Sequence, residues 1–117
     1  RYLKPVVEGR HRSVFAMTEP GGAGSDPSQL TTEAVFDGRH YRIDGLKWLI
    51  TGARHAGTWI VMARVAPNPH GPDGPTLFLC PGDAPGIAIE RVMNSMDRNY
   101  VEGHGVVRFE GLTLGPD

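Results

Sequence analysis

The sequence predicts an all-β fold, a flattened antiparallel β-barrel or sandwich of about seven or eight short strands. Two observations carry this prediction. The 16 glycines and 10 prolines are spread along the 117 residues as turn signals, and the extended runs between them are short, with no helical periodicity of any length. Hydrophobic residues make up 39% of the chain and charged residues 21%, which is typical of one globular domain.

The expected strands follow one another between these turn signals. They are Ser13–Thr18, 31–36, 39–43, 46–51, 58–65, 76–80, 87–93, 105–110 and 112–114. Asp37-Gly38 predicts a hairpin because both residues tolerate a positive φ, and Asp44-Gly45 predicts a second tight turn. The segments predicted as loops or turns are 52–57, 66–75, 81–86 and 94–104, and the prolines of 66–75 exclude a central strand there.

Charge and composition exclude several functions. A net charge of −1 gives no electrostatic basis for binding nucleic acid or an anionic membrane surface. No apolar run approaches the roughly 20 residues of a membrane span, and no signal peptide opens the chain, so we expect a cytoplasmic protein. The single cysteine, Cys80, is predicted to be a small buried hydrophobe. The five histidines show no ligand-like spacing, so no metal site is expected.

A glycine-rich loop follows the first expected strand. Pro20 fixes its own φ and biases Glu19 away from helix, so the strand has to end there. The glycines that follow allow positive φ and expose backbone N–H groups, and Ser25 and Asp26 add a hydroxyl and a carboxylate. The pattern suits a phosphate or a flat polar ring, although many glycine-rich turns bind nothing.

Several motifs resemble one family. Residues 18–26, Thr-Glu-Pro-Gly-Gly-Ala-Gly-Ser-Asp, resemble the motif that opens the middle domain of the acyl-CoA dehydrogenase family, with one extra glycine at position 21 or 22. Residues 44–53, Asp-Gly-Leu-Lys-Trp-Leu-Ile-Thr-Gly-Ala, resemble the second signature of this family. Further similarity, in the same order, lies at residues 59–64, 85–87 and 103–109.

The resemblance implies a fold, a reaction and partners. Residues 1–12 would be the tail of a preceding helical domain and its linker, and 13–117 the middle β-barrel domain, with the flanking helical domains outside this chain. The implied enzyme is an FAD-dependent oxidoreductase that oxidises an acyl-CoA thioester at its α and β carbons and passes hydride to flavin N5. An electron-transfer flavoprotein or a similar acceptor and a homodimer or homotetramer are also implied. The catalytic base is expected in the C-terminal domain, so this chain alone should be inactive.

The resemblance also assigns site residues. The expected cofactor-binding residues are Phe15, Met17, Thr18, Gly24, Ser25, Leu49 and Thr51, and Ser25 is also expected to meet the substrate. Thr18 would polarise the flavin edge and Thr51 would lie near N5. No catalytic residue and no metal ligand is assigned.

Three neighbours of these residues leave questions open. Leu49 stands where the family commonly has a tryptophan, and Trp48 lies one position earlier. Adjacent strand residues face opposite sides, so either the aromatic contact is lost or a local bulge restores it. Glu19 is expected to brace the turn, and His104 to be a solvated loop histidine, although one branch of the family has a similar Gly-His segment.

Two alternative readings remain. The same fold occurs in flavin monooxygenases and in acyl-CoA and nitroalkane oxidases, because a fold does not fix the chemistry. A β-barrel interaction module without a cofactor is the other alternative.

Overall fold

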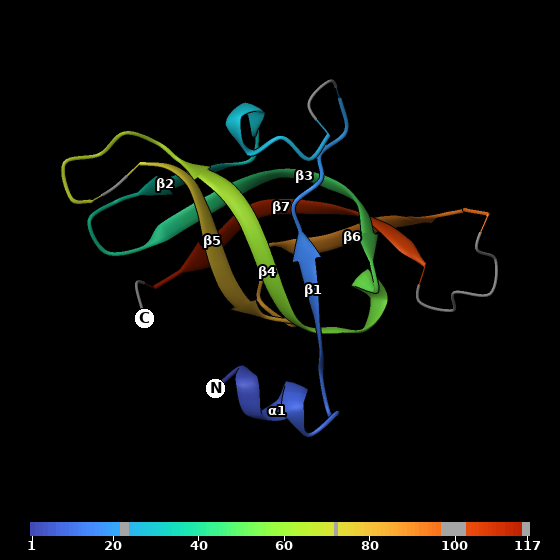
Figure 1. Ribbon diagram of the computed structural model, residues 1–117. Coiled ribbons are helices and arrows are strands. Elements are labelled where there is room, and N and C mark those ends of the chain that lie inside the picture. The colour runs from blue at the N-terminus through green and yellow to red at the C-terminus, as the bar shows by residue number, and fades with distance from the viewer. Residues whose placement is uncertain (22–23, 72, 97–102, 116–117) are drawn as a thin grey trace.

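The computed structural model describes residues 1–21, 24–71, 73–96 and 103–115. Its seven strands form one curled sheet in the order β1-β4-β2-β3-β7-β6, with β5 paired to β4 (Figure 1). The strands are β1 (Arg12–Ala16), β2 (Glu33–Phe36), β3 (Tyr41–Thr51), β4 (Ala56–Val65), β5 (Gly74–Pro81), β6 (Ile87–Met93) and β7 (His104–Leu114). The helices are the short α1 (Leu3–Val7) and two 3₁₀ turns, η1 (Pro27–Gln29) and η2 (Ala53–His55). The predicted all-β fold is confirmed.

The sheet is mixed, not wholly antiparallel as predicted. β1 runs parallel to β4, with Ser13 opposite Thr58, and β2 runs parallel to the end of β4, with Glu33 opposite Arg64. β5 pairs antiparallel along β4 from Thr58 to Val65, so β1 and β2 share the other edge. The parallel pairs arise because long connections, not tight hairpins, bring the chain back to β4.

The predicted turn at Asp44-Gly45 is wrong, because β3 runs through it without a break. The pairing with β7 only shifts register between Ile43 and Gly45. A Cβ on Gly45 would lie 2.4 Å from Thr32 Oγ1, so the glycine serves a close approach of the Thr32 segment and not a turn. An Asp-Gly pair permits a reversal of the chain but does not impose one.

The predicted break between 105–110 and 112–114 is also absent, since β7 is continuous through Gly111. Gly111 has a φ of +63°, and its N–H donates to Asp44 Oδ1 at 2.7 Å. A left-handed glycine opposite a register shift is the arrangement of a β-bulge. The two long strands therefore bend together instead of ending.

Other predicted boundaries shift by a few residues. The strand expected at 87–93 is confirmed, whereas β1 ends before Met17 and β5 begins inside the proline-rich segment, at Gly74. β5 pairs with β4 only among the described strands, and such an edge position tolerates Pro75. In the expected loop 94–104, residues 97–102 lie outside the described residues, and His104 belongs to β7.

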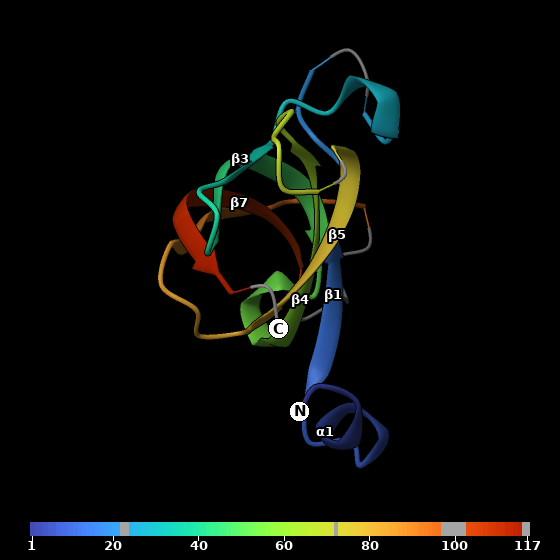
Figure 2. The ribbon, with the colours of Figure 1, turned by 90° about the vertical axis from the view of Figure 1, so that its left-hand side faces the viewer.

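The core lies between two layers, with β3 and β7 on one side and β1, β4 and β5 on the other (Figure 2). Trp59 and Phe109 meet edge to face across it, with ring centroids 6.1 Å apart. Cys80 is fully buried beside the Trp59 carbonyl oxygen, and burial raises the pKa of its thiol to about 12. The prediction of a buried cysteine is confirmed.

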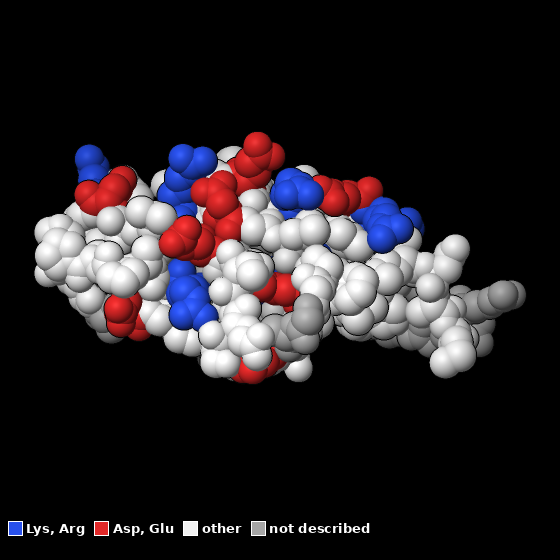
Figure 3. Space-filling model, turned by 90° about the horizontal axis from the view of Figure 1, so that it is seen from above, with Lys and Arg blue, Asp and Glu red and all other residues white. Residues whose placement is uncertain are grey.

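The face of the molecule seen from above carries charges of both signs (Figure 3). Lys and Arg side chains alternate with Asp and Glu side chains on the face seen from above (Figure 3). In the described part of the chain, no helix has the length and apolar character needed to cross a membrane. Within the same residues, no three His, Cys, Asp or Glu side chains gather in a way that could hold a metal ion.

Candidate functional site

A buried ion pair anchors the loop that follows β1. The side chains of Lys47 and Glu19 are 0% and 6% exposed, and Lys47 Nζ lies 2.9 Å from Glu19 Oε1. Lys47 Nζ also donates to the Met17 carbonyl oxygen at 2.8 Å. The lysine on β3 thereby binds the residue that directly follows β1.

Both oxygens of the Glu19 carboxylate accept hydrogen bonds. Thr31 donates to Oε2 through its backbone N–H at 2.7 Å and its hydroxyl at 2.6 Å, and the Thr32 N–H donates to Oε1 at 2.9 Å. Burial raises the pKa of Glu19, but the hydrogen bonds from Thr31, Thr32 and Lys47 outweigh it and lower the pKa to about 2. Glu19 braces the loop, as predicted.

Lys47 is not among the site residues expected from the sequence. Burial lowers the pKa of its ammonium group, and the neighbouring Glu19 carboxylate opposes that effect. We hold both groups to be charged at neutral pH, since the lysine donates to two oxygens. One feature of the sequence could have identified Lys47. It is flanked by apolar residues at an inward-facing position of a strand, and a buried lysine requires a buried partner.

A bulge lies next to Lys47 on β3. The pairing with β7 shifts register between Lys47 and Ile50, both of which face the core, and Leu49 has a left-handed φ of +56°. Two residues, Trp48 and Leu49, therefore stand where regular alternation would place one. Of the two alternatives raised by the sequence, a lost aromatic contact or a local bulge, the structure has the bulge. The rule that adjacent strand residues face opposite sides therefore does not apply to Trp48 and Leu49.

Trp48 and Leu49 differ in exposure. Leu49 is 46% exposed, whereas Trp48 is half-buried and its Nε1 has no hydrogen-bond partner among the described residues. The Trp48 backbone N–H donates to the Thr18 carbonyl oxygen at 3.0 Å. This bond ties the end of β1 to the bulge on β3.

The expected site residues gather around this junction. Phe15 is 48% exposed on β1, where it alternates with buried Val14 and Ala16, and the half-buried Met17 and Thr18 follow it. Leu49 and Thr51 are exposed at the end of β3. The structure thus brings together residues that are more than thirty positions apart in the sequence.

The glycine-rich loop closes on itself beside the junction. Glu19 N–H donates to the Gly24 carbonyl oxygen at 3.0 Å. Gly24 has a φ of +54°, and apart from its chain neighbours no described residue has an atom within 4 Å of the place a Cβ would occupy. Ser25 is exposed on the far side of this contact. Asp26 caps η1 by accepting from Ser28 and Gln29, and the Ser28 hydrogen bonds in particular lower the pKa of its carboxyl group.

The residues at the junction fit a flat ring with a polar edge. Thr18 and Thr51 supply neutral hydroxyls, Phe15 and Leu49 supply exposed apolar surface, and Gly24 leaves open space for close approach. The Thr18 hydroxyl makes no hydrogen bond to another described residue, so it is available to a ligand. Such a donor set matches the isoalloxazine of a flavin.

His104 differs from its expected place in a solvated loop. It is the first residue of β7, is half-buried, and its Nδ1 lies 2.9 Å from Thr51 Oγ1. Residues 51 and 104 are register partners on β3 and β7. A residue expected to be free in solvent is therefore in contact with one of the predicted cofactor residues.

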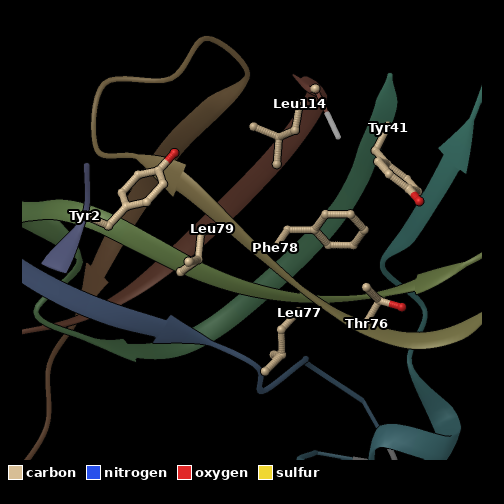
Figure 4. A pocket seen from close by; sticks show the side chains of 8 residues that line it. Tyr2, Tyr41, Thr76, Leu77, Phe78, Leu79 and Leu114 are labelled. Atoms are coloured by element: carbon tan, nitrogen blue, oxygen red, sulfur yellow. The ribbon is translucent and has the colours of Figure 1, made fainter. Parts of the chain in front are cut away.

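A second surface feature lies at the other end of β3. A groove of about 490 Å³ is lined mainly by apolar side chains (Figure 4). The lining residues are Tyr2, Tyr41, Thr76, Leu77, Phe78, Leu79, Leu114 and Gly115. None of them is charged, so the groove offers hydrophobic contact and no acid–base chemistry, and it does not coincide with the expected cofactor residues.

The outer face of β1, β4 and β5 is also apolar. Phe15, Ile60 and Leu79 form one row across the three strands, and Met62 and Leu77 form the next. Phe15, Leu77 and Leu79 are each about half exposed, at 48%, 54% and 51%. This face begins at the junction described above.

Comparison with known proteins identifies the family. The family model described as "Acyl-CoA dehydrogenase, middle domain" matches residues 14–111. The protein named probable acyl-CoA dehydrogenase FadE2 of Mycobacterium tuberculosis is 38% identical over 119 residues, which cover 97% of this chain and 28% of that protein.

Solved structures share the fold. A Mycobacterium abscessus protein that bears an acyl-CoA dehydrogenase name is 38% identical, with a TM-score of 0.85 over 97% of this chain and 29% of that one. TdsC from Paenibacillus sp. A11-2, solved with FMN bound, is 25% identical, with a TM-score of 0.80 over 100% of this chain and 28% of that one. This chain thus spans less than a third of the length of these relatives. It belongs to the acyl-CoA dehydrogenase family, a family of flavin-dependent oxidoreductases, and corresponds to the middle domain.

Proposed function

We propose that this chain forms one wall of the flavin and acyl-CoA site of an FAD-dependent acyl-CoA dehydrogenase. The observation that carries the proposal is the hydrogen bond of 3.0 Å from the Trp48 N–H to the Thr18 carbonyl oxygen, which ties the start of the glycine-rich loop to β3 three residues before Thr51. A flavin bound here would supply the hydride acceptor for oxidation of an acyl-CoA at its α and β carbons. The chain's own part is to bind and orient the ring.

Two hydroxyl groups carry the polar contacts in this proposal. Thr18, next to the Gly24 turn, polarises the ring edge and stabilises the negative charge that develops there. Thr51 contacts the ring from the end of β3, and Phe15 and Leu49 exclude water from its apolar part. Ser25, exposed beyond Gly24, binds the entering acyl-CoA.

Neither carboxylate beside the loop can serve as the base. Glu19 is buried, ionised and bonded to Lys47 and two threonines, and Asp26 is occupied in capping η1. A base needs a pKa near the working pH and access to the substrate. Glu19 is buried and its pKa is lowered to about 2, and the Ser28 hydrogen bonds lower the pKa of the exposed Asp26. In this proposal, as the family resemblance implies, a carboxylate of the C-terminal helical domain removes the α-proton.

The outer apolar face fits the same arrangement. Phe15, Leu77 and Leu79 are each about half exposed on this face and so present hydrophobic surface to solvent. In this proposal the helices of the flanking domains cover this face, and the complete protein forms a dimer or tetramer through them. The expected redox partner of the complete protein is an electron-transfer flavoprotein or a similar acceptor.

The test uses the full-length protein that contains this chain. Its flavin would be released by heat and identified as FAD or FMN, and the bound flavin would then be mixed anaerobically with a panel of acyl-CoAs. Bleaching of the oxidised band by some members of the panel is the expected result. A bound flavin that no acyl-CoA reduces, or one whose reduced form reacts rapidly with oxygen, would favour the monooxygenase or oxidase branches instead.

Matched variants locate the site within the chain. Thr18→Val and Thr51→Val should weaken FAD binding by about tenfold each, since each removes a hydrogen bond but keeps the side-chain volume. Ser25→Ala should raise the KM for acyl-CoA with little change in FAD affinity. Thr113→Val is the control, because this exposed threonine on β7 bonds only to the Gly111 carbonyl oxygen. Equal FAD affinity in all four variants would contradict the assignment.

A further inference from the structure

The groove at the Tyr41 end of β3 lies where β7 ends. β7 stops at Leu114, and Leu114 and Gly115 both line the groove, which has a volume of about 490 Å³. Leu114 is the register partner of Tyr41, and the Tyr41 ring meets the Phe78 ring edge to face with centroids 5.1 Å apart (Figure 4). A chain that continues beyond β7 therefore starts inside this groove.

The groove runs along the free edge of β5. Four consecutive residues of this strand, 76–79, line it. Successive side chains of a strand point to opposite faces, so a groove that all four line follows the edge of the strand and does not lie over one face. One edge of β5 is bonded to β4, and β5 has no second partner among the described strands. The backbone N–H and C=O groups of its other edge are available to a further extended segment.

The chemistry of the groove favours an extended polypeptide. Apolar side chains and a free strand edge are the two features by which proteins bind an added strand, because backbone hydrogen bonds supply affinity and side-chain pockets supply specificity. None of the lining residues is charged, whereas the neighbouring hollow of about 370 Å³ contains Arg1 and Asp83. A segment with apolar side chains therefore fits the groove better than the hollow.

The chain before Tyr2 is less suited to the groove. Tyr2 lines the groove and directly precedes α1, with helical backbone angles of φ −88° and ψ −41°. Residues before it would extend α1 as a helix, whose backbone N–H and C=O groups are bonded within the helix. A helix cannot supply the hydrogen bonds that the edge of β5 accepts and donates, so the segment that follows β7 is the better occupant.

We propose that the segment following Asp117 in the full-length protein lies extended in this groove and pairs with the free edge of β5. The inference rests on the proposed function, which puts a C-terminal domain after this chain. Because this chain spans less than a third of the length of its relatives, a complete protein of this family has further chain to fill the groove. The segment is tethered at the groove itself, so little loop-closure entropy opposes its binding.

The first test is photo-cross-linking in the full-length protein. Thr76→benzoylphenylalanine would put a photoreactive group on the β5 wall of the groove, away from Leu114 (Figure 4). After irradiation and digestion, mass spectrometry should find this group joined to a peptide within about ten residues after Asp117, since extended residues advance roughly 3.4 Å each. A link to any other peptide, a link between two copies, or no link overturns the inference.

A matched variant tests the position of the segment at this end of the sheet. Asp83 is exposed and lines the neighbouring hollow but not the groove. Asp83→benzoylphenylalanine should therefore form no link to the peptide after Asp117. A link from position 83 without one from position 76 would put the segment in the hollow and overturn the inference.

The second test needs no variant. Hydrogen–deuterium exchange of the wild-type full-length protein, resolved to single residues, would follow the amides of residues 76–80. In an edge strand every second amide points away from the partner strand, whereas a strand with two partners has all of its amides bonded. Uniformly slow exchange from 76 to 80 is the expected result, and fast exchange at alternate residues overturns the inference.

Neither test involves the flavin. Full-length protein whose flavin is bleached by an acyl-CoA, but which forms no link from position 76, would overturn this inference alone. Full-length protein that binds no flavin, but forms the link, would overturn the proposed function alone.

Discussion

The two ends of β3 are organised in different ways. At the Tyr41 end, Asp37 Oδ1 accepts from the N–H groups of Arg39 and His40, and the rings of Phe36 and Tyr41 stack with centroids 4.6 Å apart. All of these partners lie within a few residues of one another. At the Thr51 end, Lys47 bonds to Glu19 and Thr51 to His104, which are distant in the sequence.

The β2–β3 hairpin is formed by interactions between residues close in the sequence, whereas the proposed site is formed by interactions between residues distant in the sequence. Local turn chemistry is sufficient to form the β2–β3 hairpin, and nothing there is strained. The other end contains a buried charge pair and a leucine in the left-handed region. Both are unfavourable alone, so the surrounding sheet has to stabilise them. The proposed ligand-binding residues Leu49 and Thr51 lie at this second end, where residues distant in the sequence fix the side-chain positions.

The largest expected effect on stability comes from removing the ion pair between Lys47 and Glu19. Lys47→Met should lower the free energy of unfolding by about 3 kcal/mol, because it leaves the Glu19 carboxylate buried without its cation. Urea unfolding of the full-length protein, followed by tryptophan fluorescence, would measure this loss. Lys4→Met is the matched control, since Lys4 is 80% exposed in α1. Similar losses in both variants would contradict the role given to the pair.

The next effect is a dependence on pH. Glu19 has a pKa of about 2 in the folded chain against an ordinary value of 4.5, so its ionised form stabilises the fold above pH 4.5. That contribution, roughly 3 kcal/mol, should be lost as the pH falls from 4.5 toward 2. Melting temperatures of wild type and Glu19→Gln across this range would show it. The two curves should converge at low pH, and a constant difference between them would exclude the linkage.

A smaller effect is expected at the bulge. Leu49→Gly should raise the free energy of unfolding by about 0.5 kcal/mol, since relief of the left-handed strain slightly exceeds the entropy cost of glycine. The same change at Leu46, which is on the same strand but does not have a positive φ, should be destabilising. Thermal unfolding of both variants would test this contrast, and a loss of stability in Leu49→Gly would show that the bulge is not strained.

The smallest effect is expected at the local end. Asp37→Ala removes the acceptor for two backbone N–H groups in an exposed turn, where water can replace it. The melting temperature should fall by less than in Lys47→Met, and FAD affinity should not change. A loss of flavin on this substitution would show that the two ends of β3 are coupled.

The same comparison shows what could be predicted from the sequence. The hairpin at Asp37-Gly38, the strand at 87–93 and the burial of Cys80 depend on local patterns, and all three are confirmed. The continuity of β3 through Gly45 was missed, because it depends on Thr32 passing close to that glycine. The cofactor residues were expected from motif resemblance, and they stay a prediction, although the structure does gather most of them at one junction.

Lys47 and His104 show why the rest of the site escaped prediction. A lysine in an apolar strand indicates a buried partner, but the pattern alone does not say that the partner is Glu19. His104 pairs with Thr51 only through the register of β3 and β7, which is fixed by two bulges. Register is a property of the whole sheet, so short-range patterns carry little information about it.

The position of β4 has a consequence for how the domain forms and opens. β4 is hydrogen-bonded along both edges, to β5 on one side and to β1 and β2 on the other. Its parallel partners come from far earlier in the chain, so this part of the sheet closes large loops and should form late in folding. Once formed, the amides of β4 should exchange with solvent deuterium more slowly than those of β6, which pairs with β7 alone among the described strands.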